Sequence, residues 1–555
     1  MVGGRMRTFF LLLLAIVLCA SACGGHWPSI TPAKATADTS QSGVSYYVSP
    51  TGHDKSAGTS PSTAWRTLAR ASAAVIRPGS RLLLKGGATF TGQLKFGPRD
   101  AGNPARPVLI GSFGKGRATI TDSQGSAVVI FDTAGVRIAN LNMVGTGPLR
   151  PESCGILLFS DLAGKPRLRN IAITNVNVAG FGTGISIGAA HATGFNGVKV
   201  TNARLHGNLD AGLGSYGPAF NTGSPVYAHE NVTISNVIAF GNRGDPANTS
   251  HNSGSGIVLG NVAGASILWS TTYDNGGKGG DKNEGPEGIW TYDATHVMIE
   301  HDLSYKNDSA IKVDGGGFGF DENTTKSTMQ YNLSYDNHGP GFLFYARRKA
   351  PQTGNTVRFN ISSGDVRTNG AAGAITMNGP VRRASVYQNT VVVSAPAGLI
   401  HSAVRLGRPL KAATLRNNLF VAKGAATDVV ATSALSRKQA LLQGNDYYTT
   451  ASSPPFAWGL STYDSLQTWR TATRQEFVAA KATGFAVNPK LIGPVLGLHI
   501  GSPASPAAGA GFMLRRSSRL VGAGLDLARL FGIRPGQVDF SGHPMSLRHP
   551  NVGAQ

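Results

Sequence analysis

The sequence predicts an all-β fold in which short parallel strands stack into a long coil, a β-solenoid. Glycine makes up 73 of the 555 residues, about twice its usual share of roughly 7%. A strand-like segment recurs about every 30 residues, and no helical hydrophobic period runs through the segment that contains this repeat. A hydrophobic content of 41% suffices to bury a large core, which excludes wholesale disorder and a small disulfide-stapled module.

The repeat unit is a short alternating strand that ends in Asn. It reads Ile138-Ala-Asn140, Ile173-Thr-Asn175, Val200-Thr-Asn202 and Ile234-Ser-Asn236. It continues less strictly at Ile267, Ile299, Met329, Val357, Val386, Leu415 and Leu442. A second short strand follows each turn, and coils of about 22 to 30 residues stacked roughly 4.8 Å apart enclose a continuous apolar interior. Gly and Asn suit the corners because both tolerate left-handed backbone.

The two ends of such a coil expose sheet edges and need covers. Residues Pro61 to Val75 carry apolar side chains at helical spacing and predict an N-terminal capping helix, and Tyr463 to Ala480 predict a second helix at the other end. The expected organisation is a signal peptide at 1–22, a flexible linker at 23–44, the solenoid at 45–450 and a small C-terminal capping region at 451–555.

The N-terminus has the pattern of a secretory signal. Arg5 and Arg7 precede an apolar run and the small residues Ala20-Ser21-Ala22. Cys23 follows, and the site resembles a bacterial lipoprotein processing site with Cys23 as the lipidated residue; ordinary cleavage after Ala22 is the alternative. We therefore expect an exported protein that is lipid-anchored at the cell surface or secreted. Cys154 has no evident partner, so no disulfide framework is expected.

The charge balance favours an anionic partner. Lys and Arg number 51 against 29 Asp and Glu, which gives a net charge of +22. A basic surface concentrates polyanions, so we expect an acidic or cell-wall polysaccharide as the partner. No compact basic run or known nucleic-acid module occurs, so nucleic acid is not expected. We expect a monomer that meets the membrane only through an N-terminal lipid.

Both ends of the folded segment carry a family resemblance. The start contains Tyr46-Tyr-Val-Ser-Pro-Thr-Gly52, Trp65-Arg-Thr-Leu68, Arg77-Pro-Gly79 and Lys85-Gly-Gly87, and the end contains Ser502-Pro503, Val538-Asp-Phe-Ser-Gly542 and Asn551-Val-Gly-Ala554. These segments resemble secreted right-handed parallel β-helix proteins of the pectate-lyase-like superfamily, over essentially residues 45 to 555. The resemblance implies a right-handed parallel β-helix that acts on polysaccharides along its outer face.

The resemblance leaves the chemistry open, because the superfamily includes lyases, hydrolases, epimerases and proteins without an assigned activity. The sequence also departs from two family patterns. It has neither the paired Asp-Asp of polygalacturonases nor the Arg-x-Pro-x-x-Arg of pectate lyases. Two hypotheses follow: a carbohydrate-active hydrolase or lyase, and a non-catalytic surface protein that binds glycan or has a structural role.

The candidate site lies in residues 274 to 349, where insertions stretch the repeat. Asp293 and Asp321 stand 28 residues apart and are the predicted catalytic pair. If they lie in neighbouring coils, their carboxylates are about 5 Å apart, as in retaining glycosidases. The alternative is that either residue caps a turn or holds a cation.

Other side chains of this segment have predicted binding roles. Aromatic rings stack on sugars, and Arg and Lys pair with substrate carboxylates; the predicted substrate-binding residues are Trp290, Lys312, Tyr345, Arg347 and Arg348. Stacking inside the coil is the alternative for the aromatic residues. In a lyase, a calcium ion held by Asp314 and Asp336 together with Asp321 would neutralise a uronate, with Lys312, Arg347 or His338 as the base.

Overall fold

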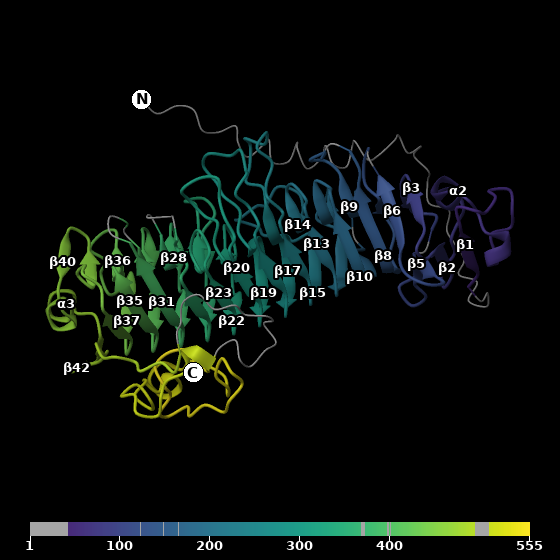
Figure 1. Cartoon of the computed structure of the whole chain (residues 1–555). Coiled ribbons are helices and arrows are strands. Elements are labelled where there is room, and N and C mark those ends of the chain that lie inside the picture. Colours follow the sequence, from purple (N-terminus) through teal and green to yellow (C-terminus); the bar gives the residue numbers. More distant parts are fainter. Residues whose placement is uncertain are drawn as a thin grey trace. The chain divides into compact units, whose positions relative to one another are not determined.

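The computed structural model describes residues 43–555 except 101, 123, 148, 165, 368–371, 397, 398, 400 and 494–509. The chain is nearly all β and forms two compact units. One contains the residues up to Gly254 together with Gly260–Val262, and the other contains Ser255–Leu259 together with Ala263–Gln555. In each unit, short strands lie in parallel rows (Figure 1), so each unit is a parallel β-helix, as the sequence predicts.

The first unit consists of three stacks of parallel strands. Stack one runs through β1 (Ser45–Val48), β2 (Arg81–Lys85), β5 (Val108–Phe113), β8 (Val136–Gly145), β10 (Leu168–Ala179), β12 (Phe195–Thr201) and β15 (His229–Ser235). Stack two runs through β3 (Thr89–Thr91), β6 (Ala118–Asp122), the second halves of β8 and β10, β13 (Arg204–His206) and β16 (Ile238–Phe240). Stack three contains β4 (Leu94–Phe96), β7 (Val128–Phe131), β9 (Cys154–Ser160), β11 (Thr183–Ala189) and β14 (Ala211–Tyr216).

The second unit repeats this arrangement. Stack one contains the end of β19 (Ile289–Glu300), β22 (Thr328–Gln330), β26 (Thr356–Arg358), β30 (Ser385–Tyr387), β34 (Ala413–Arg416) and β37 (Ala440–Gln443). Stack two contains β18 (Thr271–Tyr273), β20 (Leu303–Tyr305), β23 (Leu333–Tyr335), β27 (Ile361–Ser363), β31 (Thr390–Ala395), β35 (Leu419–Gly424) and β38 (Asp446–Thr449). Stack three contains the start of β19, β21 (Phe318–Phe320), β24 (Phe342–Tyr345), β28 (Gly373–Asn378), β32 (Ser402–Leu406), β36 (Thr427–Ala431) and β39 (Phe456–Trp458).

Three smaller features complete the set of strands. β17 (Ser255–Leu268) contributes residues to both units. β25 (Gln352–Thr353), β29 (Val381–Arg382) and β33 (Leu410–Lys411) form a short parallel sheet at the turns that follow stack three. β40 (Ser461–Tyr463) pairs with β39, and β41 (Phe477–Val478) pairs with β42 (Lys481–Ala482).

The strand register confirms the sequence repeat. Ile173 pairs with Ile138 in one neighbouring coil and with Val200 in the other. Met329 likewise pairs with Ile299 and with Val357. The recurring apolar residue is therefore the same inward-facing position in successive coils, and stacking it on itself builds the core.

Buried asparagines form a ladder in the second unit. The Nδ2 of Asn332, Asn360, Asn389 and Asn418 each donates to the Oδ1 of the next member, at 2.9 to 3.1 Å, up to Asn445. Asn445 in turn donates to Oε1 of Glu476 at 2.8 Å. The left-handed corner conformation belongs here to the residue before each Asn, namely Tyr331, Phe359, Gln388, Asn417 and Gly444. These asparagines thus bond inside the coil, and their neighbours make the turn.

Helices cover the ends, and both are shorter than the sequence pattern suggests. The N-terminal segment divides into a 3-10 turn (Pro61–Thr63) and α2 (Leu68–Ala73). The helix cannot begin earlier because Trp65 is extended and its amide donates to the Tyr47 carbonyl at 2.9 Å. At the other end, α3 (Leu466–Thr473) places Trp469 in the core, stacked on Phe456 at 4.4 Å.

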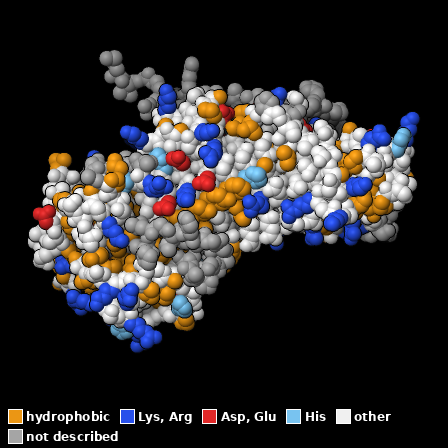
Figure 2. All heavy atoms as spheres, viewed as in Figure 1, with side chains coloured by type: hydrophobic (Ala, Val, Ile, Leu, Met, Phe, Trp, Pro, Cys, Tyr) orange, Lys and Arg blue, Asp and Glu red, His pale blue; other side chains and the backbone are white. Residues whose placement is uncertain are grey.

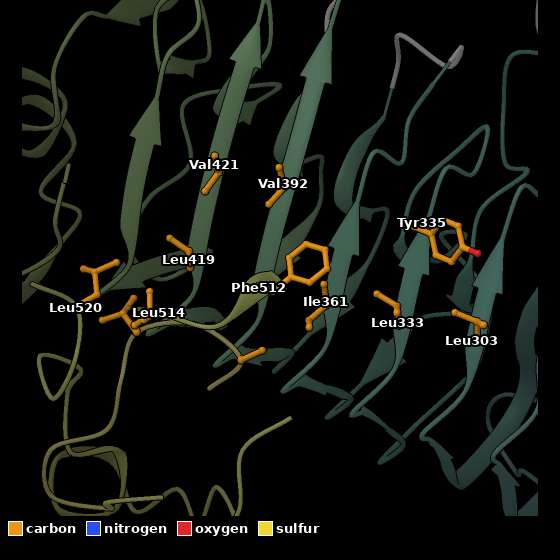
Figure 3. Packing of buried hydrophobic residues seen from close by; sticks show 12 residues of the cluster. Leu303, Leu333, Tyr335, Ile361, Val392, Leu419, Val421, Phe512, Leu514 and Leu520 are labelled. Carbon is orange, nitrogen blue, oxygen red and sulfur yellow. The ribbon is translucent and has the colours of Figure 1, made fainter. Parts of the chain in front are cut away.

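The C-terminal residues lie along the side of the second unit. Phe512, Leu514 and Leu520 pack on apolar side chains of stack two, such as Ile361 and Leu419 (Figure 3). Nearby, α4 (Leu527–Phe531) contributes Leu527 to a cluster with the corner aromatics of the Asn ladder. This segment therefore covers the outer sides of stacks one and two.

Two further observations concern the described part of the chain. None of its helices is long and apolar enough to cross a membrane. Cys154 is buried and unpaired there.

Replacing Asn389 by Ala tests the ladder. Asn389 both accepts from Asn360 and donates to Asn418 inside the coil, and each buried group left without a partner costs about 1–3 kcal/mol. We expect Asn389→Ala to lower the free energy of unfolding by about 2–5 kcal/mol, measured by chemical denaturation. Gln467→Ala, an exposed change on α3, serves as the control, and equal losses in both variants would contradict a ladder role.

Candidate active site

The candidate site lies on the outer face of stack three in the second unit. Trp290 of β19 pairs with Gly319 of β21, which pairs with Leu343 of β24. Between these outward residues, phenylalanines of β21 and β24 point inward and stack in the core. Tyr292, Asp321 and Tyr345 follow at equivalent places in the three coils. Strand alternation therefore places Asp321 on the outer face between the two tyrosines. The strands that carry these tyrosines lie about 4.8 Å away, one on each side.

Two insertions extend beside this face. The chain between β18 and β19 carries Glu284 and Glu287, and the chain between β20 and β21 carries Asp314. Oδ2 of Asp314 accepts a hydrogen bond from the Gly285 amide at 2.9 Å, which ties the two insertions together. Figure 2 shows acidic side chains close to Lys and Arg on the part of the surface where these loops lie.

Glu287 is the most buried carboxyl group of the site. It is 5% exposed, and within the described residues neither carboxylate oxygen has a hydrogen-bond partner. The carboxyl lies against Gly319, where a Cβ atom would overlap Oε2 of Glu287. Burial, and then the charges of Asp314 and Asp321, raise the pKa of Glu287 well above its usual range. Burial thus favours the neutral form of Glu287, in a space that glycine leaves open.

Asp321 also favours its protonated form. Burial and the neighbouring charge of Glu322 raise the pKa of Asp321 well above its usual value. Its Oδ1 accepts from the Glu322 amide at 2.7 Å, but this bond is too weak to offset the burial. Burial raises the pKa of Asp314 to about 6, with a further contribution from Glu284.

Arg347 neutralises part of this negative charge. Its Nε is 2.6 Å from Oε1 of Glu322, and its Nη2 pairs with Glu284 of the first insertion. Burial still raises the pKa of Glu322 to about 7, against the lowering effect of Arg347. The Tyr345 hydroxyl also interacts with Arg347. Arg347 is therefore engaged by protein carboxylates, whereas the sequence predicted that it binds substrate carboxylates.

The second predicted catalytic residue, Asp293, lies in the coil before Asp321 and is out of register with it. Its amide donates to the Glu322 carbonyl at 2.8 Å, and its Oδ1 accepts from Nδ2 of Asn323 at 2.7 Å. Tyr292 thus lies opposite Asp321, whereas Asp293 lies opposite Asn323. The register shifts by one because the later coil has an extra residue, Glu322, at this point. Burial raises the pKa of Asp293 to about 6. Asp293 and Asp321 therefore do not occupy equivalent positions of two coils, in contrast to the arrangement that the sequence predicted.

The remaining predicted binding residues differ in accessibility. Trp290 is 9% exposed, and its indole nitrogen donates to Oγ of Ser255 at 3.0 Å. Its ring centroid is 5.4 Å from that of Tyr292, so Trp290 packs beside Tyr292 and is largely covered. Lys312 in the second insertion and Arg348 after β24 are exposed.

The predicted calcium ligands do not stand together. Asp336 follows β23 at a left-handed corner of stack two, the place that Lys306 and Asp274 take in the preceding coils. Asp314 belongs to the insertion before stack three. Across the described ranges, no group of three or more His, Cys, Asp or Glu side chains is arranged to hold a metal ion.

Sequence reasoning missed the roles of Glu284, Glu287 and Glu322. All three lie in the segment that it selected, but insertions have no strand phase from which a side-chain direction follows. The glycine at position 319 was the available signal, because an outward-facing Gly within a strand marks a close approach by another group.

Comparisons with known proteins agree with the fold. No family model matches the chain. The lacto-N-biosidase of Bifidobacterium longum is 23% identical over 491 residues, which cover 71% of this chain and 30% of that protein. This chain therefore spans about a third of the length of that relative.

Solved structures show the same architecture. The GH136 lacto-N-biosidase of Eubacterium ramulus superposes with a TM-score of 0.52 at 17% identity, over 65% of each chain. A pectate lyase matches over 93% of this chain and 96% of its own with a TM-score of 0.42 at 17% identity. The chain thus has the right-handed parallel β-helix fold expected from its resemblance to the pectate-lyase-like superfamily.

Replacing Glu287 by Gln tests its protonation state. Since its pKa is raised in the folded protein, ionisation costs stability as the pH rises above the ordinary Glu range near 4.3. We expect the wild type to lose stability on going from about pH 4 to about pH 8, and Glu287→Gln to lose less, because the amide cannot ionise. Guanidinium unfolding across this range measures the difference. Asp464→Asn, an exposed carboxyl change, should follow the wild type, and identical pH curves for all three proteins would refute a neutral Glu287.

Proposed function

We propose that the chain is a glycoside hydrolase that cleaves a polysaccharide or oligosaccharide on the outer face of stack three. The observation that carries this proposal is the gathering of carboxyl groups with different proton affinities on one face. Asp321 favours the protonated form, while the pKa of Asp293 is only about 6. Such a difference supplies both an acid and a base from identical side chains.

The proposed roles follow from these affinities. Asp321, on the face between Tyr292 and Tyr345, donates its proton to the glycosidic oxygen as the bond to the anomeric carbon breaks. Asp293, ionised near neutral pH, accepts the proton of the water that attacks that carbon, or attacks the carbon itself. Two further residues set the charge of the face. Glu287 interacts electrostatically with Asp321, and Arg347 pairs with Glu322.

The charges of this face favour hydrolysis over elimination. A lyase neutralises a uronate carboxylate at the reacting ring, but Arg347 on this face already pairs with Glu284 and Glu322. A uronate at that place would have to compete with these two protein carboxylates for the guanidinium. The lacto-N-biosidase relatives support a carbohydrate substrate, and we propose that the ring cleaved is uncharged. A non-catalytic glycan-binding protein is the alternative.

Substitution of Asp321 by Asn tests the catalytic assignment. The mature protein is incubated with neutral and uronic-acid glycans, and reducing ends and the absorbance of unsaturated ends are measured. We expect reducing ends without absorbance from the wild type, and at least about a hundredfold less from Asp321→Asn. Activity should also fall below about pH 6 as Asp293 protonates.

The control for this experiment is Lys438→Gln, an exposed change far along the chain, which should retain full activity. If the absorbance of unsaturated ends increases, the protein is a lyase and the hydrolase proposal is wrong. Glycan binding without either product would leave the non-catalytic alternative.

We also propose that the protein is exported and lipidated at Cys23, which lies outside the described residues. The support is the sequence pattern of a charged start, an apolar run and small residues before the cysteine. We expect the native protein to incorporate labelled palmitate and to partition with membranes, and Cys23→Ser to do neither while remaining in the exported fraction. Palmitate in Cys23→Ser, or none in the wild type, would contradict lipidation.

A further inference from the structure

The charges of the second unit are divided along the sequence. Between Asp274 and Glu322 the chain has eleven acidic residues, more than a third of its 29. Between Asp365 and Asp428 it has none, but eight Lys and Arg. Because each coil advances along the solenoid, this division in sequence is also a division along the stacks.

Two outward columns of side chains show the same change of charge. On stack three, the register runs Trp290, Gly319, Leu343, Thr376 and Arg405. At the turn that follows, it runs Thr295, Thr325, Thr353, Arg382 and Lys411. Both columns are uncharged in the coils that carry Asp293 and Asp321, and both become cationic in the coils that follow.

The cations lie within reach of an extended ligand. Arg405 is three strands from Gly319, which is about 14 Å at the interstrand spacing. Arg382 and Lys411 lie two and three strands beyond Thr325. Arg408 is exposed in the short link between β32 and β33. An oligosaccharide lying along the solenoid spans this distance, and a single sugar ring does not.

Among the described residues, these cations have no acidic partner. No ion pair there joins Arg382, Arg405, Arg408 or Lys411 to an acidic side chain. Arg382 and Lys411 are direct register partners, and like charges in that relation are destabilising. Arg405 is half-buried, and burial lowers the pKa of its guanidinium. An anionic ligand would offset both effects by pairing with these cations.

We propose that Arg382, Arg405, Arg408 and Lys411 form an anion subsite that binds a carboxylate or sulfate group of a glycan. This proposal rests on the proposed function, because the glycan bound at the subsite is the one whose uncharged ring is cleaved at Asp321. The substrate is then an acidic heteroglycan, with a neutral residue at the cleaved bond and an anionic residue about 14 Å along the chain. This arrangement reconciles a net charge of +22 with an acidic cleavage face.

Binding measurements test the subsite independently of cleavage. Fluorescent oligogalacturonate, dextran sulfate and neutral dextran are titrated against the mature protein, against Arg405→Gln and against Arg382→Gln/Lys411→Gln. We expect each variant to weaken binding of an anionic probe about tenfold or more and to leave neutral dextran unchanged. The probe with the larger loss identifies carboxylate or sulfate as the group bound. Thermal unfolding shows that the variants fold.

A charge-matched control excludes a general effect of basicity. Arg516→Gln/Arg519→Gln removes two exposed charges on the C-terminal segment and should bind as the wild type does. Equal weakening in this control, unchanged binding in both subsite variants, or equal competition by double-stranded DNA would overturn the subsite. Asp321→Asn should still bind the anionic probe: if it does and the wild type cleaves no glycan, the subsite stands and the proposed hydrolase fails.

Discussion

Parallel pairing between successive coils is the constraint on which the rest of this structure depends. Strands within a stack are hydrogen-bonded to the coil before and the coil after, so a residue inserted within a strand would turn the side chains that follow it in that strand to the opposite face. Insertions are tolerated at the turns. The two that precede β19 and β21 carry Glu284, Glu287 and Asp314, and they deliver these acids to a face whose strands supply Tyr292, Asp321 and Tyr345. The site thus combines side chains from paired strands with side chains from segments that lie outside the strand pairing.

The burial of acids is what gives this face its chemistry. In water, Glu287, Asp321 and Asp293 would be ionised at neutral pH, with pKa values near 4. On the face of stack three they differ, because Asp293 keeps an amide donor from Asn323 while Glu287 has no donor among the described residues. Gly319 contributes to this burial, because it leaves room for the Glu287 carboxyl group. A side chain at that position would overlap the Glu287 carboxyl group and displace it.

The fold was predictable because the same pattern of apolar residues recurs in successive coils. Residues such as Ile173 and Met329 recur at inward positions, and the register pairs them as the sequence pattern requires. The candidate site was predictable only as a region. The extra residue Glu322 shifts Asp293 out of line with Asp321, and no periodicity reveals a single bulged residue. Helix ends were also misjudged, because Trp65 has a helical spacing in sequence but bonds to β1 as an extended residue.

The ladder of asparagines also determines where the coil stops. A carboxamide both donates and accepts, so each asparagine requires another on the next coil and invites the series to continue. Glu476 occupies the final place, and a carboxylate only accepts. Its carboxylate also accepts from Tyr447, Thr483 and the Gly444 amide, and it offers no amide donor to a further coil. The same residue therefore acts as a chain terminator against end-to-end growth, the failure to which a solenoid with an open edge is most prone.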